Sequence, residues 1–154
     1  MALITISSFN EFSKYLGSEL GASQPLKVTQ EQINQFADAT LDHQWIHTDL
    51  EKAAAGPFGS TIAHGYLTLS LVPFMWGQIL EAQNLKMMVN YGIERFKFGQ
   101  PVPVGSELLL KAKLENLTNL RGITKAEVAA RMEIVGNKKP AFTGVLVLLY
   151  HFND

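Results

Sequence analysis

The sequence predicts a domain of the α+β class, in which a long apolar helix is wrapped by a curved antiparallel sheet. Helical patterns fill the first half of the 154-residue chain, and alternating segments rich in β-branched and aromatic residues fill the half after Glu81. Between them, Ala53 to Leu80 carries no Asp, Glu, Lys or Arg, so it is the element apolar enough to be enclosed by a sheet. A chain of this length is expected to form one domain over residues 1–154.

The segments before the apolar run are bounded by capping and stop signals. We expect a helix over Phe9–Leu16 that stops at Gly17, and a second helix that begins at the Thr29–Gln32 capping box and ends near Thr40. The stretch Leu41–Thr48 shows no periodicity, and it is followed by a short helix Leu50–Ala55 that Asp49 caps. The cluster Gly56-Pro57-Phe58-Gly59 then predicts a loop.

The apolar run has two interpretations. Ile62 to Leu80 approaches the ~20 apolar residues of a membrane span. It contains His64, Pro73 and Gln78, however, and lacks a flanking Lys or Arg, which are features that disfavour insertion. We therefore interpret it as a helix buried in a protein core.

Four strands are expected after Glu81. They cover Lys86–Phe98, Glu107–Leu117, Ile123–Val135 and Ala141–Phe152. The connections between the later strands are short enough for hairpins, which predicts an antiparallel sheet. The charged residues of Thr124–Glu133 share one parity and the apolar residues the other, so this strand has one wet and one packed face.

Composition excludes several functions. With 13 Lys+Arg, 14 Asp+Glu and a net charge of −1, the chain has no basic cluster to bind nucleic acid or an anionic membrane. Without cysteine it has no disulfide, thiol nucleophile or Cys-based metal site, and it gives no sign of an oxidising compartment. The first residues show no basic targeting region, so we expect a cytoplasmic protein.

The irregular stretch Leu41–Thr48 holds the first candidate active-site residues. Asp42 and His47 supply a carboxylate and an imidazole, the pair that general acid–base catalysis uses near neutral pH, and a bent loop would direct both to one water. A structural alternative is that Asp42 caps a turn and His47 is a satisfied polar residue.

His64-Gly65, at the head of the apolar helix, is a second candidate. A glycine lets a ligand approach the backbone, and a helix N-terminus offers free N–H groups to a developing negative charge. The alternative is that Gly65 permits close packing of helix on sheet and that His64 is hydrogen-bonded in the core.

Other chemistries have weaker support. A metal could be held by His43 and His47 with Asp42, His64 or His151, but no carboxylate is placed to orient either histidine. Nucleophile-elbow and nucleotide-binding glycine motifs are absent from the sequence. An acyl tunnel could be lined by Met75, Trp76, Met87 and Met88, although such residues more often fill a core.

Three stretches in the same order resemble one known family. Ala37–Thr48 (ADATLDHQWIHT), Phe58–Leu71 (FGSTIAHGYLTLSL) and Asn90–Gly105 (NYGIERFKFGQPVPVG) resemble the MaoC-like dehydratases, the (R)-specific enoyl-CoA hydratase group of the hot-dog fold. The nodulation-protein-N-like subgroup looks closest, and the similarity spans about Gln30 to Tyr150.

The resemblance implies roles for particular residues. The family motif D-x-N-P-x-H places the catalytic pair at Asp42 and His47, and it makes Gly65 the backbone N–H donor to the thioester oxygen at the start of a central helix from about Gly65 to Leu80. The chain departs from the family at Gln44 and Trp45, where the motif has Asn and Pro, and at Pro73, where some members have Ser.

The implied function is reversible hydration of a trans-2-enoyl thioester by a water that Asp42 and His47 activate. It requires no cofactor and no metal, and the thiol is coenzyme A or acyl-carrier protein. Two alternatives stay open, a hot-dog thioesterase and a non-catalytic acyl-thioester binding protein. Because the strands after Lys86 leave open sheet edges, and because hot-dog proteins commonly pair their sheets, we expect a homodimer or larger homo-oligomer with substrate near the subunit boundary.

Overall fold

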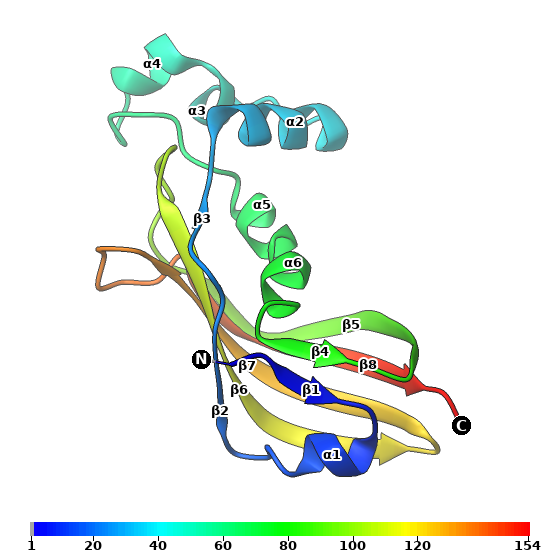
Figure 1. The fold of residues 1–154 in the computed structure, drawn as a ribbon. Helices are drawn as coiled ribbons and strands as arrows, with labels where there is room; N and C mark the ends of the chain where they lie inside the picture. Colours follow the sequence, from blue (N-terminus) through cyan, green and yellow to red (C-terminus); the bar gives the residue numbers. More distant parts are fainter. Residues whose placement is uncertain (1) are drawn as a thin grey trace.

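Four long strands form the body of the sheet in the computed structural model, which describes residues 2–154 (Figure 1). They are β5 (Leu85–Phe98), β6 (Glu107–Leu120), β7 (Ile123–Ile134) and β8 (Phe142–Phe152). All neighbours are antiparallel, in the order β2-β6-β7-β8-β5. The four strands expected from alternation are therefore confirmed, with bounds shifted by one to three residues.

Four short strands complete the structure, and the sequence pattern did not predict them. β2 (Glu19–Ala22) and β3 (Leu26–Lys27) both pair with β6, whereas β1 (Ile4–Ile6) pairs in parallel with β4 (Leu80–Ala82). Segments of two to four residues are too short to show alternation, and a partner strand far away in the chain supplies their hydrogen bonds.

The register of the sheet places the apolar parity on one face. In β7, Ala126, Val128, Ala130 and Met132 are buried, as predicted. Val128 lies opposite Leu114 of β6 and Leu146 of β8, so one buried row crosses three strands. The sheet curls around this face, and the central helical segments lie against it (Figure 1).

Six helices lie within the described residues. They are α1 (Phe9–Ser13), α2 (Gln30–Thr40), α3 (Trp45–Thr48), α4 (Leu50–Ala54), α5 (Gly65–Ser70) and α6 (Val72–Trp76). The caps Thr29 and Asp49 each accept a backbone N–H, which confirms the starts of α2 and α4. α1 is three residues shorter than expected, since the chain turns from Lys14 onward. α3 is one helical turn inside the stretch that was expected to be irregular.

The expectation of one central helix from Gly65 to Leu80 is wrong. α5 and α6 are separate segments that meet at Leu71, and Leu80 already belongs to β4. Pro73 explains the interruption, because it has no N–H to continue the helical ladder and is tolerated in a first turn. Burial is also incomplete, since Tyr66 is 69% exposed and Phe74 is 61% exposed. Across residues 2–154, none of the helices is long and apolar enough to cross a membrane.

α6 is fixed to the sheet by its last residue. Trp76 is buried, and its indole Nε1 donates to the Tyr150 hydroxyl of β8 at 2.8 Å. The Phe12 ring meets Tyr150 edge-on at 5.4 Å, and burial raises the pKa of the Tyr150 hydroxyl far above its ordinary value. This contact fixes the axis of α6 and, through Leu71, the position of α5.

Candidate active site

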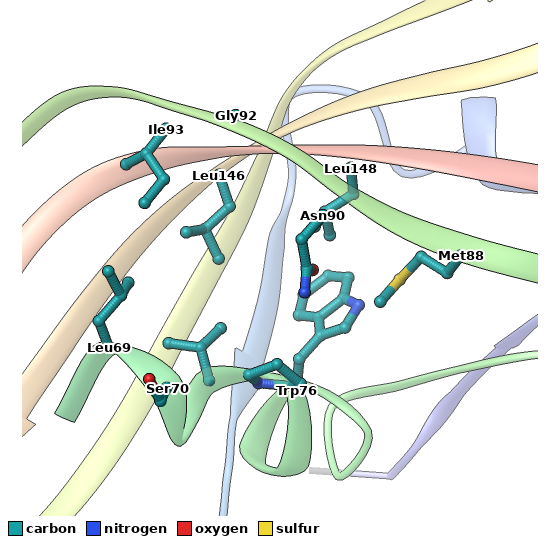
Figure 2. Close-up of a pocket in the computed structure, with 11 residues that line it drawn as sticks. Leu69, Ser70, Trp76, Met88, Asn90, Gly92, Ile93, Leu146 and Leu148 are labelled. Atoms are coloured by element: carbon teal, nitrogen blue, oxygen red, sulfur yellow. The ribbon is translucent and has the colours of Figure 1, made fainter. Parts of the chain in front are cut away.

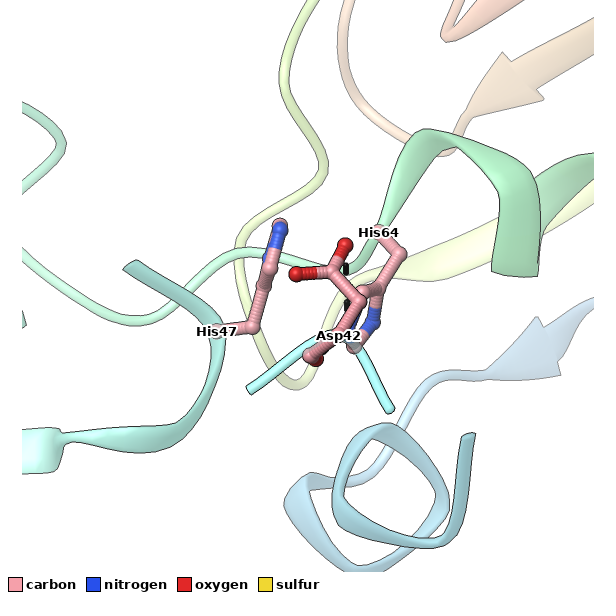
Figure 3. A group of neighbouring side chains, drawn as sticks. All are labelled: Asp42, His47 and His64. Atoms are coloured by element: carbon pink, nitrogen blue, oxygen red, sulfur yellow. Dashed lines mark hydrogen bonds and ion pairs between the residues drawn. The ribbon is translucent and has the colours of Figure 1, made fainter. Parts of the chain in front are cut away.

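Asp42, His47 and His64 meet at the end of the sheet where α5 begins (Figure 3). Asp42 follows α2, His47 lies on α3, and His64 is the N-cap of α5. Their carboxylate and ring nitrogen atoms lie within 4.8 Å of one another. The structure thus brings together the two residues that the sequence motif pairs, and it adds His64 to them.

Backbone geometry brings Asp42 over the two histidines. Leu41 ends α2 in the left-handed conformation, with φ of 66°, which is uncommon for a residue other than glycine. α3 then returns the chain, and the Ile62 N–H donates to the Ile46 carbonyl at 3.0 Å. The Gln30 amide donates to the His47 carbonyl at 2.8 Å, so α2 and the strand-like segment before α5 both hold α3.

His47 is arranged as a neutral base. Its side chain is buried, and Nδ1 lies 2.8 Å from the Ile62 carbonyl oxygen. Because a carbonyl only accepts, Nδ1 carries the proton and Nε2 keeps its lone pair. Burial lowers the pKa of His47 below its ordinary 6.5, with a smaller lowering by the neighbouring His64; the Ile62 bond and Asp42 act in the opposite direction. At neutral pH, His47 is therefore ready to accept a proton.

The Asp42 side chain is about half exposed and opens toward solvent. Its Oδ1 accepts the Gln44 backbone N–H at 3.3 Å, so the turn-capping interpretation of Asp42 is correct as far as this oxygen goes. The other oxygen, Oδ2, lies 4.0 Å from His64 Nε2. The carboxylate can cap the turn and still face the histidines.

Gly65 is the first residue of α5, and its N–H has no acceptor within residues 2–154. A packing role is present at the same residue. A Cβ built on Gly65 would lie 2.7 Å from a ring carbon of Phe98, at the end of β5. The glycine therefore both exposes a helix N–H and lets the Phe98 ring approach the backbone.

The metal-ligand set that the sequence allowed is not assembled. His43 pairs instead with Asp38 at 3.8 Å on the surface, and His151 lies on β8 opposite Met87. In the remaining group, the His47 and His64 rings are stacked at 3.9 Å with 23° between their planes. Lone pairs of nearly parallel rings do not converge on one point, so this geometry does not suit a tetrahedral ion bound by both histidines.

A largely apolar cavity of about 210 Å³ lies between α5, α6 and the sheet (Figure 2). Leu69, Val72 and Trp76 line one side of it, and β5 and β8 line the other. Trp76 and Met88 contribute as the tunnel interpretation allowed, whereas Met75 is fully buried core. Asn90 and Ser70 are the polar side chains in its wall. Leu69 is one helical turn beyond Gly65 on α5, and Gly65, Asp42, His47 and His64 are not themselves part of the lining.

Comparison with known proteins identifies the family. Residues 11–137 match the family described as the MaoC like domain. The chain is 42% identical over 147 residues to 3-hydroxyacyl-thioester dehydratase Z of Mycobacterium tuberculosis, covering 95% of this chain and 97% of the relative. It is 38% identical over 149 residues to nodulation protein N of Rhizobium meliloti, covering 95% and 92%.

Solved structures agree with this assignment. The (R)-hydratase from A. caviae involved in PHA biosynthesis superposes with a TM-score of 0.70 at 26% identity, over 86% of this chain and 94% of that one. The chain belongs to the MaoC-like dehydratase family. The predicted family, hot-dog fold and hydratase or dehydratase class are thereby confirmed.

Proposed function

We propose that the protein reversibly hydrates trans-2-enoyl thioesters to (3R)-3-hydroxyacyl thioesters, with Asp42 and His47 as the catalytic pair. The observation that carries the proposal is the convergence of a half-exposed carboxylate with a neutral imidazole whose Nε2 lone pair is free. The family and the names of the relatives support the same chemistry.

The geometry supports a sequence of steps for hydration. A water held between Asp42 and His47 Nε2 loses a proton to the pair while its oxygen bonds to the β-carbon. The electron pair of the C=C bond moves toward the thioester carbonyl, where the Gly65 N–H donates to the developing oxyanion. The proton that the pair removed is returned to the α-carbon, so water adds across the double bond without a net change in the enzyme.

The cavity along α5 and α6 is proposed to hold the acyl chain. Its lining is apolar except for Asn90 and Ser70, and the lining residue Leu69 lies one turn after Gly65 on the same helix. Its volume of about 210 Å³ is below the ~300–1,000 Å³ usual for small-molecule sites. Because the exposed strand β5 forms one wall, a second subunit could extend the site there.

That second subunit is proposed to be another copy of this chain. Within residues 2–154, β5 is an outer strand of 14 residues with one edge paired to β8 and the other unpaired, and it exposes Tyr91, Ile93, Met87 and Val89. A long apolar sheet edge favours association, and a two-fold contact between β5 strands would cover both copies at once. We also propose a cytoplasmic location, in keeping with a composition that contains no cysteine.

The deciding assay uses purified protein with crotonyl-CoA, longer enoyl-CoA thioesters and the matching acyl-carrier-protein thioesters. Hydration consumes the enoyl absorbance and produces a 3-hydroxyacyl thioester without releasing thiol. Stoichiometric release of free thiol would identify a thioesterase instead. Tight binding of acyl-CoA without either product would identify a binding protein, and it would refute the assignment of Asp42 and His47 as catalytic.

A further inference from the structure

His64 contacts both proposed catalytic residues, yet it has no part in the steps above. It is 2% exposed, and Nε2 lies 3.0 Å from the backbone carbonyl oxygen of Asp42. Because that oxygen only accepts, Nε2 carries a proton and donates it. The bond spans 22 residues and ties the start of α5 to the residue that follows the left-handed Leu41.

The His64 ring is itself held firmly. It stacks on His47 at 3.9 Å and meets the Phe36 ring of α2 at 4.9 Å. Its backbone carbonyl accepts the N–H groups of Leu67 and Thr68, which fixes the residue at the first turn of α5. Because the His64 ring is confined in this way, it restricts where the Asp42 backbone and the His47 ring can lie.

Packing alone does not account for a histidine at this position. Nδ1 of His64 is buried without a hydrogen-bond partner in the described part of the chain. An unpaired buried acceptor destabilises a fold, and a phenylalanine would fill the same space without it. What the histidine supplies and phenylalanine lacks is the Nε2 donor to Asp42.

We propose that His64 is a positioning residue for the catalytic pair, holding Asp42 through its Nε2–H and His47 through the stacked ring. This inference rests on the proposed roles of Asp42 and His47. His64 does not contact the thioester in this scheme. Its loss therefore lowers kcat and leaves KM nearly unchanged, since misplacing a reacting group by ~1 Å costs up to ~10²-fold in rate.

Three substitutions separate the donor from the ring. His64→Gln places an amide N–H near the position of Nε2, whereas His64→Asn places it near Nδ1, out of reach of the Asp42 carbonyl. His64→Phe keeps a flat ring and has no donor. We expect kcat of the Asn and Phe variants to fall at least about tenfold with KM within about twofold, and the Gln variant to recover most of kcat.

Two activity results would overturn the proposal. One is wild-type kcat in His64→Phe or His64→Asn, even if the melting temperature falls, because that identifies a purely structural residue. The other is an equal loss of kcat in the Gln and Asn variants, because the bond to Asp42 would then not be the cause.

A measurement on the wild-type protein tests the proposal without relying on activity or on variants that fold. Long-range ¹H–¹⁵N correlation spectra should show His64 protonated at Nε2 and His47 at Nδ1. The opposite tautomer of His64 overturns the positioning role. If the wild type hydrates no enoyl thioester, the proposed function fails, while the tautomer and the ¹⁵N relaxation of amides 41–44 in the Gln and Asn variants still decide whether His64 orders Asp42.

Discussion

Replacement of Gly65 by alanine tests the oxyanion role most directly. The structure gives this glycine two separate roles, since it exposes a helix N–H and leaves room for the Phe98 ring. The added Cβ would lie 2.7 Å from a Phe98 ring carbon, 0.7 Å inside the 3.4 Å at which ordinary contact begins. Phe98 is partly exposed and can turn away, so we expect a cost of about 1 kcal/mol in unfolding free energy. The helix propensity of alanine offsets this by at most ~1 kcal/mol.

The expected effect on catalysis is much larger than the effect on stability. A methyl group beside the free N–H would crowd the thioester carbonyl away from it, and loss of one oxyanion donor typically costs 10²- to 10³-fold in kcat. The sequence alone suggests that Gly65→Ala is at least as stable as the wild type. The Phe98 contact corrects that expectation, since its cost brings the net change in unfolding free energy close to zero or makes the variant slightly less stable than the wild type.

A second substitution separates the two causes. Phe98→Leu removes ring atoms that the new Cβ would meet, and it serves as the matched background for Gly65→Ala. We expect Phe98→Leu to stay active and the double variant to regain stability yet remain slow, measured by urea unfolding and by crotonyl-CoA turnover. Full turnover in the double variant would refute the oxyanion role, because displacement of Phe98 would then explain the single variant.

Further predictions concern the catalytic pair, pH and assembly. Asp42→Asn and His47→Ala should each lower turnover by at least ~10²-fold, and the double variant should be little worse, because the effects of residues that act as a unit are not additive. A normal rate of hydration by a folded Asp42→Asn variant would remove Asp42 from the mechanism. The pKa of His47 is lowered below its ordinary 6.5, so kcat/KM should persist at neutral pH and fall below pH 6.5, where Nε2 becomes protonated. A ¹H NMR titration of the His47 ring should accordingly give a midpoint below 6.5. As pH falls, the His47 side chain becomes protonated in the unfolded state before it does in the folded state. The free energy of unfolding should therefore decrease below pH 6.5 in the wild type, and the His47→Gln variant should lack this contribution to the pH dependence. Light scattering should give at least twice the 17.1 kDa chain mass, and Ile93→Lys on β5 should weaken assembly; a fully active wild-type monomer would refute both the dimer and the shared site.

Long periodic elements could be predicted from the sequence because each contains several repeats of its pattern. Alternation over ten or more residues identified β5 to β8, and the Thr29 cap identified the start of α2. The break at Pro73 was visible in the sequence, but the apolar composition around it favoured one continuous helix. The pairing of β1 with β4 joins residues more than 70 positions apart, and no local pattern encodes it.

The site was predictable only as far as its motif reaches. Asp42 and His47 lie five residues apart, so a bend in one loop was enough to bring them together. His64 reaches Asp42 across 22 residues, and Phe98 reaches Gly65 across 33, so neither contact could be inferred from spacing. The His64-Gly65 dipeptide was a signal for a ligand site, yet it did not indicate which atoms His64 binds.

The departures from the family motif at positions 44 and 45 are compatible with an assembled pair, for a reason the backbone supplies. Gln44 donates its own backbone N–H to Asp42, and its carbonyl accepts the His47 N–H at 3.0 Å, so neither bond depends on the side chain. Trp45 starts α3, where a proline would also fit, and its ring packs against Gly56 and lies 4.7 Å from the Lys52 ammonium. Pro73 is different, because it lines the cavity at the position where the resemblance implies a Ser in some family members. Substitution at 44 or 45 should therefore change stability more than chemistry, whereas a hydroxyl introduced at 73 should add to the polar groups of Asn90 and Ser70 in the wall of the proposed acyl site.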